Sequence, residues 1–66
     1  MEWSQSELAE ALRQLDSILR KLRGTVQTLE SKETPERYRS QLTLARRRIQ
    51  ALEIAVQLIQ QELNQH

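Results

Sequence analysis

Few side chains in this sequence of 66 residues could carry out covalent chemistry. There is no cysteine, and the single histidine is His66, so neither a thiolate nucleophile nor a Cys/His metal site can be assembled. One glycine cannot form a phosphate-binding loop. The carboxylates considered as acid or base are spread along the chain: Glu7, Glu10, Asp16, Glu30, Glu53 and Glu62. The sequence therefore predicts a protein that is not an enzyme and has no catalytic residue, metal or cofactor.

The residues with the most regular spacing are apolar, and their chemistry is burial. Two series recur at alternating intervals of four and three residues, which places each series along one side of a helix. The first is Leu8, Leu12, Leu15, Leu19, Leu22, Val26 and Leu29, and the second is Tyr38, Leu42, Ala45, Ile49, Leu52, Val56, Ile59 and Leu63. We call the two together the seam. They predict an all-α fold, a coiled-coil-like helix-turn-helix in which two antiparallel helices form a hairpin.

The ends of these helices carry recognisable signals. Ser4 and Glu7 form a capping-box pattern, which predicts a first helix over about residues 5–31. A turn over about 32–34 follows, with Thr34 as an N-cap and Pro35 at the first position of a second helix over about 35–64. Gly24 costs about 1 kcal/mol relative to alanine in a helix interior, and its position is on the outer side of the first helix. The 66 residues thus form one domain.

A second set of apolar residues lies beside the seam at 100° steps. Its members share one side of the predicted hairpin, because the two rows are displaced in the same rotational sense on antiparallel helices. They are Ala11, Ile18, Leu44, Ala51, Ile54, Ala55 and Leu58, and we call them the docking face. Small residues let a foreign helix approach, and larger ones supply burial. The docking face predicts a helical protein partner, and a homodimeric four-helix bundle is the alternative.

The other side of the predicted hairpin is rich in arginine. We expect Arg13, Arg20, Arg23, Arg39 and Arg46 there, with Asp16 and Glu53 among them. A nucleic-acid-binding regulator is a weaker alternative: Arg46, Arg47 and Arg48 point in directions 100° apart, and Asp16 is spaced to pair with Arg20. The net charge of +1 argues neither for nor against nucleic acid. On the spacing of these charges, the sequence favours a solvated side or a rim that attracts an acidic protein.

The two aromatic residues have separate predicted places. Trp3 precedes the first helix and is expected either to cover the open end of the hairpin near Ile59 and Leu63 or to anchor a partner. Tyr38 is expected to close the seam near Leu29, with its hydroxyl group reaching solvent.

The hydropathy pattern gives an expectation about location. No apolar run approaches the roughly 20 residues that span a bilayer, so we expect no membrane association. The start, Met1 to Ser4, has neither the basic nor the apolar region of a signal peptide. The expected location is the cytoplasm.

The hairpin length, the segment Pro35-Glu36-Arg37-Tyr38 and the segment Ala51-Leu52-Glu53-Ile54-Ala55 with Ile59 together resemble a known family. This family is the small co-chaperones of type III secretion needle subunits (YscE/PscE/AscE). The resemblance covers nearly the whole chain. It implies a two-helix hairpin in the bacterial cytoplasm that pairs with a tetratricopeptide-repeat chaperone, the two together keeping the needle subunit soluble and unpolymerised. Gly24 lies well before the turn, which implies a turn of different length or shape from relatives.

Overall fold

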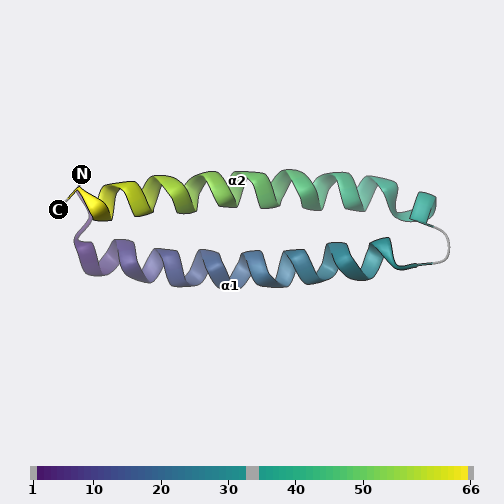
Figure 1. Cartoon of the computed structure of the whole chain (residues 1–66), viewed down its shortest axis with the longest axis horizontal. Helices are drawn as coiled ribbons and strands as arrows, with labels where there is room; N and C mark the ends of the chain where they lie inside the picture. Colours follow the sequence, from purple (N-terminus) through teal and green to yellow (C-terminus); the bar gives the residue numbers. More distant parts are fainter. Residues whose placement is uncertain (1, 33–34, 66) are drawn as a thin grey trace.

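Two long helices lie side by side and antiparallel in the computed structural model, which describes residues 2–32 and 35–65 (Figure 1). Helix α1 spans Gln5–Glu30, a short 3-10 helix η1 spans Pro35–Tyr38, and α2 spans Arg39–Asn64. The molecule is a rod with dimensions of 48 × 15 × 15 Å. The predicted all-α hairpin is confirmed, and no strand occurs among the described residues.

Helix α1 begins at the predicted capping box. The Ser4 Oγ accepts a hydrogen bond from the Glu7 backbone N–H at 3.2 Å, and the Ser4 N–H donates to Glu7 Oε1 at 3.0 Å. Each bond satisfies a backbone donor that the first turn of a helix leaves without an intrahelical partner. The start of α1 is therefore encoded locally.

Helix α1 ends at Glu30, and the backbone N–H of its C-cap Ser31 donates to the carbonyls of Gln27 and Thr28 at 3.2 and 3.3 Å. The Ser31 hydroxyl also donates to the Thr28 carbonyl at 2.8 Å. The predicted N-cap Thr34 lies outside the described residues. Where an α-helix was expected from Pro35, residues 35–38 form η1 and α2 starts only at Arg39. Tight 3-10 turns are common at helix N-termini, because their backbone angles lie close to those of the α-helix.

The seam holds the two helices together. Leu8, Leu19, Leu42 and Ala45 are buried, and the other seam residues are half-buried. No described side chain is completely enclosed, because two helices can cover each other along only one stripe. Such a core supplies little stability for a chain of this size.

Gly24 does not interrupt α1. Its φ angle is not positive, and a Cβ atom built on it would meet no atom within 4 Å. We therefore expect Gly24→Ala to raise the free energy of unfolding by about 1 kcal/mol, through helix propensity and a less flexible unfolded chain. Urea denaturation followed by circular dichroism measures this change.

Ala9→Gly is the matched control, since Ala9 is also exposed within α1. This reverse substitution should lower the stability by a similar amount. If Gly24→Ala destabilised the chain, that result would show that position 24 is covered in solution.

Candidate partner-binding face

The docking face contains every large aliphatic side chain that the described hairpin leaves exposed. Ile18, Leu44, Ile54 and Leu58 each keep 45–60% of their surface accessible. Neighbouring seam residues on the same helices are buried or half-buried. The exposed side chains therefore do not belong to the seam, and the packing of α1 against α2 leaves them accessible to solvent.

The docking face also contains three small residues. Ala11 and Ala55 are half-buried and Ala51 is exposed. Their short side chains leave the surface low between the larger aliphatic groups, where a foreign helix could approach closely. From its helical position, Ile54 lies farthest from the seam, on the outer side of α2.

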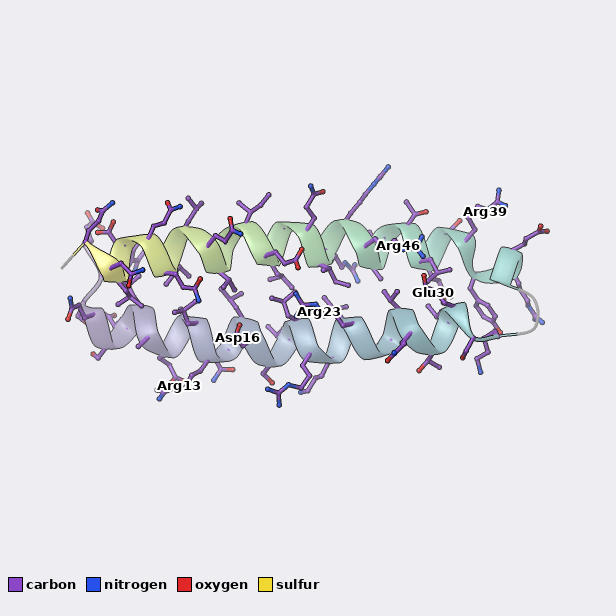
Figure 2. All side chains as sticks on the ribbon, viewed as in Figure 1. Arg13, Asp16, Arg23, Glu30, Arg39 and Arg46 are labelled. Atoms are coloured by element: carbon purple, nitrogen blue, oxygen red, sulfur yellow. The ribbon has the colours of Figure 1, made fainter. Side chains whose placement is uncertain are left out.

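Ion pairs mark the other side of the hairpin. Arg23 donates to Glu53 across the helices at 2.7 Å, and Arg46 pairs with Glu30. Figure 2 shows Arg23, Glu30 and Arg46 with Asp16 along the junction of α1 and α2. The four paired side chains are each about half exposed, so each pair contributes little stability.

The arginines do not form the common band that the sequence predicted. Arg13 points away from α2, and Arg39 points away from α1 (Figure 2). Arg13 pairs with Glu10 on its own helix. The predicted pair of Asp16 with Arg20 is not among the ion pairs of residues 2–32 and 35–65. An exposed pair of this spacing contributes only a few tenths of a kcal/mol, too little to fix two long side chains.

Charge is distributed unevenly along the rod. The two termini lie together at one end and the turn at the other (Figure 1). The terminal half, residues 2–16 and 54–65, has five acidic side chains and one basic. Residues 17–32 and 35–53 have nine basic and three acidic. The half of the hairpin near the termini is therefore acidic and the other half is basic, so a partner that lies along the hairpin would contact negative charge at one end and positive charge at the other.

Trp3 lies beside a hollow at the open end of the hairpin. The hollow has a volume of about 650 Å³, and we call it the open-end pocket. It is lined by Trp3, Ser6, Glu7, Leu8, Glu10, Ala11 and Ile59. Trp3 lies near Ile59, as one prediction required, but Leu63 is not in the lining and Trp3 remains 59% exposed. Trp3 therefore forms one wall of an open pocket that the sequence pattern does not predict.

The two carboxylates of the open-end pocket are stabilised in their charged forms. The backbone N–H of Ser4, and then its hydroxyl, hold the pKa of Glu7 below its ordinary value of 4.5. The side-chain amide of Gln14, and then the Arg13 guanidinium, lower the pKa of Glu10. Both groups are therefore negative at neutral pH.

The capping box makes the stability of the hairpin pH-dependent. The pKa of Glu7 is lower in the folded chain than its ordinary value of 4.5, so the ionised carboxylate stabilises the fold. This stabilisation is fully present above the pKa of the unfolded chain and is lost as the pH falls through the pKa of the folded chain. We expect Glu7→Gln to be less stable than the wild type at neutral pH, with the difference vanishing in acid. Thermal melts across this pH range measure the difference.

Ser4→Ala tests the other half of the capping box. It removes the hydroxyl acceptor, so it should cost about 1 kcal/mol. Equal pH profiles for the wild type and Glu7→Gln would contradict the effect assigned to the carboxylate.

The described residues contain neither a metal-site cluster nor a membrane-spanning helix. No group of three or more His, Cys, Asp or Glu residues within them could hold a metal ion. None of the helices that the structure describes is both long and apolar enough to cross a bilayer.

Comparisons with known proteins found no relative. No protein-family model, no curated protein and no solved structure matches this chain. Function is therefore inferred from the docking face, the open-end pocket and the resemblance described above.

Proposed function

We propose that this hairpin is a small co-chaperone that docks on a helical-repeat chaperone. With that chaperone, it would keep a type III secretion needle subunit soluble and unpolymerised in the bacterial cytoplasm. The docking mode follows from the chemistry of the docking face, and the identity of the partners follows from the family resemblance. No bond is made or broken in this function.

The observation that carries the docking step is the exposure of Ile18, Leu44, Ile54 and Leu58. Covering one such side chain contributes about 1.5–3 kcal/mol before the costs of association. Because the docking face lies beside the seam on each helix and its large side chains are not used in the seam, a partner can cover it without opening the hairpin. This separation suits a module that folds as a hairpin and binds as a preformed surface.

The proposed mechanism is mass action. A partner that binds only the folded hairpin stabilises it by about 2.7 kcal/mol when its free concentration is one hundred times the dissociation constant. The same linkage stabilises the partner. Two marginally stable proteins would in this way persist together.

The test is affinity capture of the tagged chain from its native lysate, followed by native mass spectrometry. Recovery of one hairpin with one helical-repeat protein and one small needle-like subunit is the expected result. Recovery of the hairpin only as a self-associated species would overturn the proposal and leave the homodimeric four-helix bundle.

The melting of the isolated chain is an independent check. With the docking face uncovered, we expect a broad transition at low temperature that does not depend on concentration. A sharp transition at high temperature that rises with concentration would instead identify the homodimer.

A further inference from the structure

The open-end pocket has the dimensions and the walls of a binding site. Trp3, Leu8, Ala11 and Ile59 supply apolar surface. Its volume of about 650 Å³ falls within the range of roughly 300–1,000 Å³ that is usual for ligand pockets. An aromatic side chain would fit inside and could contact the indole ring of Trp3.

The rim of the pocket is negative. Glu7 and Glu10 line it, and hydrogen bonds keep both carboxylates ionised. Arg13 balances the charge of Glu10, whereas no ion pair among the described residues involves Glu7. The surrounding terminal half of the hairpin is also strongly acidic. A positive group at the rim would therefore be attracted and a negative group repelled.

The pocket is continuous with the docking face, because Ala11 belongs to both. A partner that covers the docking face would reach the pocket at the end nearest the termini. This continuity favours a segment of that same partner over a free small molecule.

We infer that the open-end pocket receives an aromatic side chain of the partner protein that is flanked by lysine or arginine. This inference rests on the proposed function for the presence of a partner on the adjoining face. The aromatic ring packs against Trp3 and Ile59, and the flanking cation lies against Glu7 or over the indole ring.

Two capped tripeptides test the inference on the full chain: lysine-phenylalanine-lysine and glutamate-phenylalanine-glutamate. Trp3 is the only tryptophan, so its fluorescence reports on the pocket, and amide chemical shifts map the contact. We expect the lysine peptide to bind about tenfold more tightly at low salt. Its shifts should be confined to Trp3, residues 6–11 and the region of Ile59.

Glu7→Gln tests the charge at the rim. Glutamine also completes a capping box, so this variant keeps the start of α1 while removing the negative charge. We expect the preference for the lysine peptide to fall to about threefold. The matched control is Glu53→Gln, which removes a carboxylate paired with Arg23 on the other side and should leave the preference unchanged.

Three results would overturn the inference. The two peptides could bind equally, or the shifts could spread along Ile18, Leu44 and Ile54. Alternatively, dilution without peptide could change Trp3 fluorescence and the pocket amides, which would identify a second copy as the occupant. None of these depends on recovering the partner from a lysate, so failure here is distinguishable from failure of the proposed function.

Discussion

Replacing Leu19 with alanine is expected to leave much of the isolated chain unfolded at 25 °C. Leu19 is the most buried of the described residues, with 3% of its surface accessible. A buried leucine truncated to alanine costs about 2–5 kcal/mol, and a single core of this size rarely supplies more than about 3–5 kcal/mol. The loss should appear as reduced helical circular dichroism before any denaturant is added.

Ile18→Ala is the matched control for this prediction. Ile18 is the preceding residue on the same helix, but 45% of its surface is accessible, so its truncation should change stability by less than about 1 kcal/mol. The two substitutions remove similar apolar groups from adjacent positions. If they were equally destabilising, Ile18 would have to be buried in solution by a second copy, and the isolated hairpin would not be the folded unit.

A carboxylate at position 58 is expected to abolish the complex while leaving the hairpin helical. Leu58 is 60% exposed, so Leu58→Asp does not disturb the seam. In the complex, however, the new carboxylate would be covered without a partner, which costs about 3–5 kcal/mol. The dissociation constant should rise by roughly 10²-fold to 10³-fold or more. Co-purification with the partner measures the loss, and circular dichroism verifies the fold.

Gln57→Asp is the control for Leu58→Asp. Gln57 is exposed on α2 and lines a groove with Arg23 and Glu53 on the ion-pair side, so the same charge there should leave the yield of complex unchanged. Ala51→Arg offers a second disruption of the docking face by bulk and charge. Wild-type yield with Leu58→Asp and Ala51→Arg would show that the partner binds elsewhere.

The fold could be predicted because its signals are local and periodic. The seam is defined by its four-three spacing, and every one of its residues is buried or half-buried in the structure. The capping box at Ser4 needs only two side chains three residues apart. The predicted start of α2, at Pro35, was four residues too early. The 3-10 helix η1 and the first turn of an α-helix favour the same residue types, and their backbone angles differ only slightly.

The details of the surface depended on information that periodicity does not contain. The open-end pocket exists because Trp3, which precedes α1 and has no helical position, lies near Ile59 of the other helix. The orientations of Arg13 and Arg39 depend on flexible side chains whose alternatives differ little in energy. The exposure of the docking face follows from the spacing of its residues. The identity of the partner that binds it does not, because aliphatic side chains determine the area and shape of a surface but select weakly among proteins.

The position of the two termini beside each other has a consequence for how the hairpin forms. Contacts near the turn close short loops, whereas contacts between Leu8 and the end of α2 close nearly the whole chain, at a higher cost in chain entropy. We therefore expect the contacts between the helices to form first near the turn and to open first near the termini. Opening the terminal end takes Ile59 away from Trp3, so the open-end pocket is complete only in the fully zipped hairpin.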